Sequence, residues 1–280
     1  MLRVPSSIDA QQFESLKIQE ATFVAYRSDV YPTRNEIYFE EHAVVFVLAG
    51  EKKFVAPGQS LHVRKGQILF FQRGCYSMSE SIDSEYRSLV FFFNESLLKE
   101  FVSQNQAVFS SSKNQENTAI LVLESTPTFE GFVESILGYF RGQTPFLNQF
   151  LRLKFQELLL HLLAIDTSEQ FKNTLLRIFQ GQKAALDHLM HAYYLKPLSI
   201  NELAHLSGRS LSAFKREFQE HFQTSPAAWI KNRRLEHAAF LFKNTNKNVS
   251  EVSMEVGYES VSHFIKTYKE KYGQTPTGLR

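Results

Sequence analysis

Residues 248–276, NVSEVSMEVGYESVSHFIKTYKEKYGQTP, repeat the pattern of residues 198–226, LSINELAHLSGRSLSAFKREFQEHFQTSP. After the centre of the repeat the offset is 50 residues, as between Phe214 and Phe264, and before it the offset is 49, as between Gly208 and Gly257. The one extra residue therefore falls in a turn, where a change in length is tolerated. A repeat of this kind indicates two copies of one structural unit.

Each copy has the residue pattern of a helix-turn-helix. Ser199 with Glu202, and Asn248 with Glu251, have the spacing of a capping box at the start of a first helix. A glycine then occupies the turn, and a serine precedes the second helix as its expected N-cap. These residues are Gly208 and Ser210 in the first copy, and Gly257 and Ser260 in the second.

The second helix of each copy has an apolar face, which fixes the residues that face outward. The apolar positions are Leu211, Phe214 and Phe218 in the first copy, and Val261, Phe264 and Tyr268 in the second. The outward positions are Ser212, Lys215, Arg216 and Gln219, then Ser262, Lys266 and Lys269 with His263 beside them. Such side chains reach base edges and phosphates in a major groove. A solvated face is the simpler explanation of one such helix, but two copies in register favour DNA binding.

Residues 226–242 join the two copies and are expected to form one long helix. This helix would hold the two outward faces at a fixed separation, so that they enter successive major grooves about 34 Å apart. Lys231 and Arg233 offer charge for the phosphate backbone, and Arg234 either does the same or pairs with an acidic residue inside the fold.

The composition is that of a globular protein with two domains. The chain has 280 residues, of which 43% are hydrophobic and 21% charged, and its single cysteine, Cys75, cannot form an intrachain disulfide. It contains no run of eighteen apolar residues and no apolar signal core, so we expect a cytoplasmic protein without a membrane span. Residues 182–280 contain 14 Lys/Arg against 9 Asp/Glu, and residues 1–181 contain 17 against 20, so the repeat lies in the basic part.

The first part of the chain predicts strands followed by helices. Short β-branched and aromatic runs between residues 20 and 94, separated by breakers such as Pro57-Gly58 and Lys65-Gly66, indicate a β-sandwich or barrel. Residues 103–118 are expected to be mostly a surface loop, and 129–140 and 146–163 to be helices. The second helix is apolar on most sides, which suits either a core helix or a homodimer formed through residues 129–163.

The predicted fold class is therefore α+β, with two domains. Residues 1–165 form a β-rich regulatory or dimerisation domain, 166–181 a linker with a short helical piece at 174–179, and 182–280 an all-α DNA-binding domain. Within the latter, the helix-turn-helix units span about 198–221 and 248–272 and are joined by the helix 226–242.

Few residues of the sequence suggest a catalytic or metal-binding site. The strand region offers His42 and His62 with Glu40 and Glu41, too scattered for a metal site, and His188 and His191 suit packing or surface positions. No nucleophile elbow, P-loop or dinucleotide fingerprint occurs, so we expect no catalytic residue, metal or cofactor. Cys75 is expected to be a packed residue, and the alternative is a sensor of oxidants with an exposed, ionised thiol. Apolar strand residues either fill a solid core or line a cavity for an apolar ligand: Val45, Val47, Ile68, Phe70, Val90 and Phe92.

The stretches RSLSAFKREF (209–218), SPAAWIKNRRLEHAAFLF (225–242) and GYESVSHFIKTYKEKYGQTP (257–276) resemble the DNA-binding domain of the AraC/XylS family of bacterial transcription regulators. The resemblance covers about 180–280 and implies seven helices, of which the third and sixth read DNA. Carried over by position, it implies DNA contacts by Ser212, Lys215 and Arg216, and by Val261, Ser262, His263 and Lys266. Lys266 stands where the family often has arginine and cannot form a bidentate fork. With small residues near the helix starts, base readout would rest on few contacts, and DNA shape would contribute more.

Less specifically, VVFVLAGEKKF (44–54) and LHVRKGQILFFQRGCYSM (61–78) resemble the N-terminal domains of AraC-type activators of type III secretion. That resemblance implies a cupin-like barrel, helices that pair two protomers, and control by partner proteins. The expected function is a transcription regulator, an activator, that binds double-stranded promoter DNA, works with RNA polymerase and responds to a small ligand or regulatory protein. The alternatives are a small-molecule-binding or enzymatic cupin-like protein, and a module whose basic helices bind an acidic protein.

Overall fold

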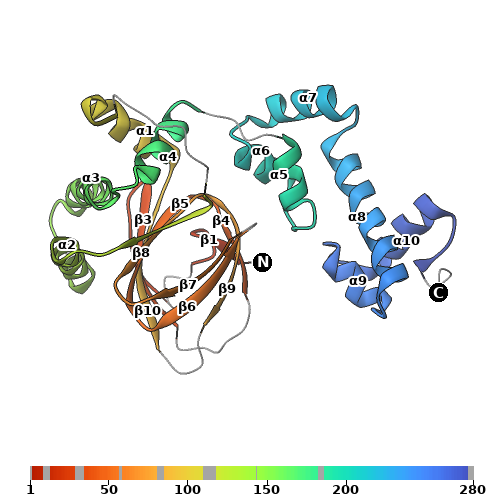
Figure 1. Ribbon diagram of the computed structural model, residues 1–280, viewed down its shortest axis with the longest axis horizontal. Coiled ribbons are helices and arrows are strands. Elements are labelled where there is room, and N and C mark those ends of the chain that lie inside the picture. The colour runs from red at the N-terminus through yellow and green to blue at the C-terminus, as the bar shows by residue number, and fades with distance from the viewer. Residues whose placement is uncertain are drawn as a thin grey trace. The chain divides into compact units, whose positions relative to one another are not determined.

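The structure is a computed structural model that describes residues 2–8, 13–28, 35–56, 59–80, 85–109, 118–142, 144–181 and 186–276. The chain forms two compact units, Met1–Gln182 and Lys183–Arg280 (Figure 1). No helix within the described ranges is long and apolar enough to cross a membrane.

The β part of the first unit consists of two sheets. The five-stranded sheet has the order β1-β4-β9-β6-β7, and the six-stranded sheet has the order β11-β8-β5-β10-β3-β2. All pairs are antiparallel except β1 with β4. The strands are β1 (Leu2–Val4), β2 (Glu14–Lys17), β3 (Ala21–Ser28), β4 (Asn35–Phe39), β5 (His42–Ala49), β6 (Glu51–Ala56), β7 (Gln59–Arg64), β8 (Gln67–Phe71), β9 (Gly74–Glu80), β10 (Tyr86–Phe93) and β11 (Ile120–Glu124).

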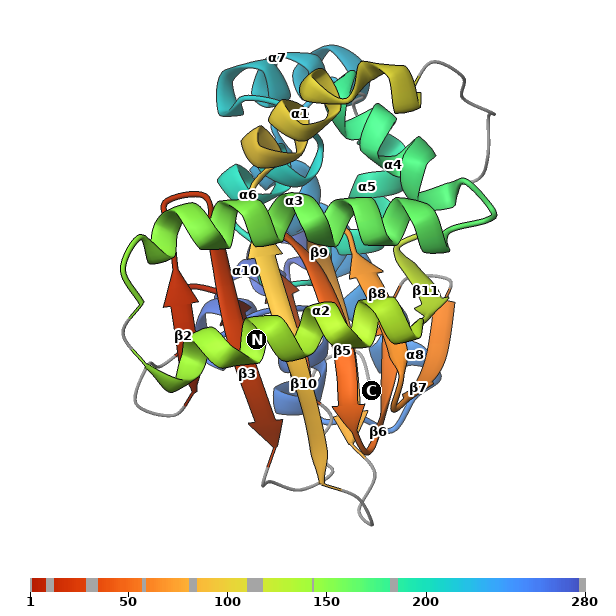
Figure 2. The ribbon, with the colours of Figure 1, turned by 90° about the vertical axis from the view of Figure 1, so that its left-hand side faces the viewer.

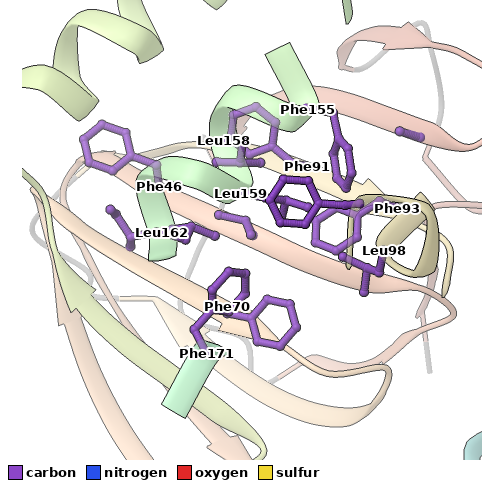
Figure 3. Close-up of a cluster of buried hydrophobic side chains, with 14 of the residues drawn as sticks. Phe46, Phe70, Phe91, Phe93, Leu98, Phe155, Leu158, Leu159, Leu162 and Phe171 are labelled. Atoms are coloured by element: carbon purple, nitrogen blue, oxygen red, sulfur yellow. The ribbon is translucent and has the colours of Figure 1, made fainter. Parts of the chain in front are cut away.

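Helices cover one face of the six-stranded sheet. They are α1 (Glu95–Gln104), α2 (Pro127–Leu137), α3 (Leu147–Ile165) and α4 (Gln170–Phe179), with short 3₁₀ turns η1 (Gln106–Phe109) and η2 (Gly138–Arg141). Figure 2 shows α2 and α3 lying across the strands, and Figure 3 shows side chains of α3 packed on Phe91 and Phe93. The Phe93 and Phe155 rings lie 5.0 Å apart, and each buried phenylalanine stabilises the fold by roughly 1.5–3 kcal/mol.

The six-stranded sheet is therefore buried on both faces. In β10, Leu89, Phe91 and Phe93 belong to the core under the helices, whereas Val90 and Phe92 belong to the core between the two sheets. Because side chains alternate along a strand, one strand contributes to two cores.

Two expectations about connecting segments are wrong. Residues 103–109 are not loop: α1 continues to Gln104, and η1 buries Phe109. The expected linker at 166–181 contains α4, which belongs to the first unit because Phe171 and Leu175 are fully buried in its core. Residues 110–117 and the Pro57-Gly58 pair lie outside the described residues.

The second unit is helical within its described residues. Its helices are α5 (Leu186–Tyr193), α6 (Ile200–Leu206), α7 (Leu211–Phe222), α8 (Pro226–Asn244), α9 (Val249–Glu255) and α10 (Val261–Tyr272). One apolar cluster joins α5, α6, α7 and the start of α8, and another joins the end of α8 with α9 and α10. The third and sixth of these helices are α7 and α10, and a seventh would fall at the C-terminal end, where residues 277–280 are outside the described ranges.

Candidate nucleic-acid interface

The first helix-turn-helix consists of α6 and α7. The Ser199 capping box is present: the Ser199 N–H donates to Glu202 Oε2 at 2.7 Å, and the Glu202 N–H donates to Ser199 Oγ at 3.2 Å. Ser210 Oγ accepts from the Ala213 N–H at 3.2 Å and so begins α7. Phe214 and Phe218 are fully buried. The opposite face exposes the expected residues Ser212, Lys215, Arg216 and Gln219.

Arg209 lies in the turn between α6 and α7 and holds this turn against α7. Arg209 Nε donates to Glu217 Oε2 at 2.9 Å, and Arg209 Nη1 donates to the Ser207 carbonyl at 3.0 Å. This contact could not be predicted from the sequence, because an arginine eight residues before a glutamate carries no distinctive signal. Arg209 is thus bound within the unit, whereas Lys215 and Arg216 are exposed on the outward face of α7.

The second helix-turn-helix consists of α9 and α10 and is built in the same way. Asn248 and Glu251 form the expected capping box, and Ser260 Oγ accepts from the His263 N–H at 3.3 Å. Phe264 and Tyr268 are buried. Val261 is partly exposed, and Ser262, His263, Lys266 and Lys269 are exposed.

The helix α8 joins the two helix-turn-helix units. Ser225 caps it and Pro226 occupies its first turn, as the sequence indicates. Arg233 lies over the Trp229 ring at 5.2 Å, with Nη1 3.3 Å from Glu236 Oε2. Lys231 Nζ lies 3.5 Å from Glu270 Oε2. Exposed ion pairs of this kind contribute little, so phosphates can replace these carboxylates at small cost.

Within the described ranges, Arg234 pairs with no acidic residue, although such a pair was one expectation, and instead donates to three backbone carbonyls. Its Nε reaches the Tyr194 carbonyl at 2.6 Å, Nη2 the Lys196 carbonyl at 2.6 Å, and Nη1 the Gly257 carbonyl at 2.7 Å. Residues 194–196 lead into α6, and Gly257 is the turn of the second unit. Burial lowers the pKa of the Arg234 guanidinium from its usual value, and Tyr258 opposes the shift. Arg234 therefore ties the two helix-turn-helix units together and is not a phosphate contact.

Gly257 is required by this close approach. Its φ is +82°, and a Cβ there would lie 2.5 Å from the Leu195 carbonyl oxygen and 2.9 Å from Arg234 Cζ. The residue must be glycine for two reasons, its backbone conformation and the lack of space.

The basic residues on the outward faces remain available for a ligand. Lys215, Arg216, Lys266 and Lys269 are exposed and make no ion pair with other described residues. Two faces with the same chemistry, each on a capped helix, are thus presented by one rigid framework, an arrangement that suits contacts to bases and phosphates.

The first unit contains a cavity of about 630 Å³ between its two sheets. Of the residues expected to line such a cavity, Val45, Val90 and Phe92 do so. Val47 is buried between the sheets but away from the cavity. Ile68 and Phe70 were assigned wrongly, because they face the helices on the other side of the sheet.

The other candidate residues in the strands are dispersed. His42 is buried and its Nδ1 accepts from the Arg73 N–H at 3.4 Å, whereas His62 lies at 3.5 Å from Glu51. Cys75 is buried. Across the described ranges, no three side chains of His, Cys, Asp or Glu are grouped as metal ligands would be.

Comparison with known proteins places both halves of the chain. Residues 203–280 match the family model of a helix-turn-helix domain, and residues 42–174 match that of the ExsA N-terminal regulatory domain. The chain belongs to the AraC family of transcriptional regulators. It is a DNA-binding regulator, and the resemblance read from its sequence is confirmed.

Relatives in this family align over most of their length. The thermoregulatory protein LcrF of Yersinia pestis is 24% identical over 90% of this chain and 93% of its own. The HTH-type transcriptional regulator ExsA of Pseudomonas aeruginosa is 25% identical over 86% of each chain. Among solved structures, ToxT from Vibrio cholerae aligns over 93% of this chain and 97% of its own with a TM-score of 0.45 and 12% identity.

Proposed function

We propose that this regulator inserts α7 and α10 into successive major grooves of promoter DNA and activates transcription together with RNA polymerase. The observation that carries the proposal is the pair of matching exposed faces on capped helices, held by α8 and Arg234. A relative named virulence regulon transcriptional activator VirF, from Yersinia enterocolitica and 23% identical, supports the activating role. Promoter DNA and polymerase imply a cytoplasmic protein.

The two faces have different capacities for reading bases. Arg216 can form a bidentate pair with guanine, whereas Lys266 can make only single hydrogen bonds. Ser212, Gln219, Ser262 and His263 offer further donors and acceptors, and Val261 offers an apolar contact for a thymine methyl group. Lys215, Lys231, Arg233 and Lys269 serve the phosphates, which give affinity but no sequence preference.

Selection of sites from random DNA by the full-length protein tests the proposal. We expect a bipartite motif whose halves are centred about one helical turn apart. Arg216→Ala should relax the preferences in one half, and Lys266→Ala should relax those in the other. Lys243→Ala, an exposed lysine near the end of α8, is the matched control and should leave both halves intact. Uniform weakening by both variants, or no enrichment at all, contradicts the assignment.

We also propose that the regulator forms a homodimer through residues 129–163. The outer side of α3 exposes an apolar stripe that begins at Phe146, just before the helix, and continues through Phe150, Leu153 and Leu160. Phe146 is 73% exposed and Leu153 60%, which is costly unless another surface covers them. Leu153→Glu should shift the protein to monomer in sedimentation velocity. Asn148→Glu places the same charge at an exposed position of α3 away from the apolar stripe and should not cause this shift.

The first unit is the natural place for the controlling signal, either a small ligand or a regulatory protein, because residues 42–174 match the ExsA N-terminal regulatory domain and because this unit contains a cavity of about 630 Å³. DNA affinity of the full-length protein, measured with and without a candidate effector, tests this control. An effector that binds the first unit and leaves DNA affinity and transcription unchanged would exclude it as the signal.

A further inference from the structure

The strand β11 forms one edge of the six-stranded sheet, and Figure 2 shows it beside the ends of α2 and α3. Its ladder with β8 continues to Ser125, whose N–H donates to the Gly66 carbonyl at 2.9 Å. Hydrogen-bonded pairs alternate along an antiparallel ladder, so the odd-numbered residues of β11 bond to β8. The backbone N–H and C=O groups of Ile120, Val122 and Glu124 therefore point away from the sheet.

One side chain already bonds to this edge as a neighbouring strand would. The Gln59 amide of β7 donates from Nε2 to the Ile120 carbonyl at 2.9 Å and accepts from the Ile120 N–H at 3.1 Å. Among the described residues, the backbone groups of Val122 and Glu124 have no such partner. Unpaired backbone groups at a sheet edge are a template for another chain, so proteins commonly cover or pair them.

The free part of the β11 edge forms one wall of a groove of about 750 Å³. Residues 122–126 make this wall, and His161 of α3 with residues 164–168 makes the other. The Val122 side chain packs between the two sheets, on the side away from α3, so Val122 lines the groove with its backbone. The unpaired N–H and C=O groups can therefore be reached from the groove.

The charged side chains of this groove are acidic. Glu124 and Asp166 line it, and its described lining residues include no lysine or arginine. A third carboxylate, that of Glu130, accepts from the Ser125 hydroxyl at 3.1 Å. A second copy of this chain would present the same acidic edge, and like charges that face each other across paired strands are destabilising. The occupant with complementary charge is a basic segment of another protein.

We propose that an extended, basic segment of a partner protein adds to β11 as a further strand. Its main chain bonds to Val122 and Glu124, which gives affinity, and its lysine or arginine side chains lie beside Glu124 and Glu130, which gives specificity. The inference goes beyond the proposed function, because this edge belongs neither to the outward faces of α7 and α10 nor to the apolar stripe of α3.

Selection of random peptides of about ten residues, displayed on phage, against the full-length protein tests the proposal. The enriched peptides should carry lysine or arginine at alternate positions, since alternate side chains of a strand share one face. They should lack proline at their centre, because proline cannot donate to a ladder. A synthetic peptide with the enriched sequence is then the probe for fluorescence polarisation.

Two variants of β11 locate the bound peptide. Val122→Pro removes an outward N–H and no bond to β8, a position that tolerates proline, and should weaken the peptide about fivefold to tenfold. Its matched control is Ser15→Pro on β2, the opposite edge of the same sheet, where the N–H also points outward. Glu124→Lys should weaken the peptide about fivefold, and Glu134→Lys, at an exposed position of α2, should not.

Amide hydrogen exchange of the wild-type protein gives a test that needs no variant. The N–H groups of Val122 and Glu124 should exchange more slowly once the peptide is bound, because each then donates to it. The proposal is overturned if no peptide is enriched, if the enriched peptides are acidic or rich in proline, or if these two amides stay unprotected. Full affinity of a folded Val122→Pro would overturn it too. If circular dichroism shows that Val122→Pro does not fold, Glu124→Lys and the exchange of the two amides decide.

Discussion

Replacing Arg234 by methionine should separate the two helix-turn-helix units without touching either outward face. The guanidinium donates three hydrogen bonds, of 2.6, 2.6 and 2.7 Å, to carbonyls on both sides of α8. A hydrogen bond to a charged group contributes about 1.5–3 kcal/mol, and three bonds from one group are not additive. We therefore expect a loss of roughly 3–5 kcal/mol in the unfolding free energy of the second unit.

The single tryptophan of the chain makes this loss measurable in one unit. Trp229 lies in the core of the second unit, so its fluorescence reports the melting of that unit alone. Each kcal/mol shifts the Tm of a domain of this size by about 4–8 °C, so Arg234→Met should melt at least roughly 12 °C lower. Lys243→Met, on the same helix and exposed, is the control and should melt with the wild-type protein.

The same variant should weaken the coupling between the two half-sites of DNA. Binding of the second unit after the first is intramolecular, and its advantage depends on a fixed geometry. Affinity for the bipartite site should fall at least about tenfold towards that for one half-site alone, which corresponds to about 1.4 kcal/mol of lost coupling. Wild-type melting together with full affinity for the bipartite site would refute the role given to Arg234.

Other residues give sharp tests as well. Gly257→Ala should destabilise the second unit more than Gly273→Ala: φ is +82° at Gly257 and +74° at Gly273, but only at Gly257 would a Cβ meet the Leu195 carbonyl. The Gly273 variant should cost about 1–2 kcal/mol, and equal melting of the two would contradict the steric argument. Ser260→Ala should cost about 1 kcal/mol through loss of the α10 cap and weaken selection at one half-site only. Burial, with smaller effects of neighbouring charges, raises the pKa of Glu41, so its ionised form destabilises the folded protein. Glu41→Gln should therefore raise the unfolding free energy at pH 7. This gain should disappear as the pH falls through the raised pKa of folded Glu41 towards the unfolded value of about 4.3. Urea titrations that show equal stability of the two proteins at pH 7 would refute this.

The second unit could be predicted almost completely because its signals are local. Caps, a turn glycine and the helical spacing of apolar residues lie within a few positions of each other, and the repeat states each signal twice. Ser199, Ser210, Asn248 and Ser260 all act as the caps that the sequence indicated. The role of Arg234 could not be read in this way, since its acceptors are carbonyls, which every residue possesses.

The first unit was harder because its central sheet is buried on both faces. Residues 42–47 of β5 are all buried, so the sequence shows one apolar run with no alternation to reveal which side chains face the cavity. The prediction for Ile68 and Phe70 is wrong for the same reason, because residues 68–71 of β8 are also all buried. The sequence predicts a linker at 166–181 because most of this segment is polar and its single apolar face, formed by Phe171 and Leu175, is narrow. The burial of Lys52 can be predicted once β6 is known to be a strand, because Lys52 and Phe54 lie two residues apart and point to the same side of it. Without that assignment, the spacing of the two residues has no meaning.

The strand β10 is a wall, one strand thick, between the cavity and the helices. Val90 and Phe92 border the cavity, while their neighbours Phe91 and Phe93 press on Phe132 of α2 and Phe155 of α3. Closely packed interiors have little slack, so volume added on one side of such a wall is felt on the other. A molecule that fills the cavity would therefore push β10 towards α3, the helix that bears the exposed apolar stripe. The stiffness of the sheet is enough to transmit this displacement.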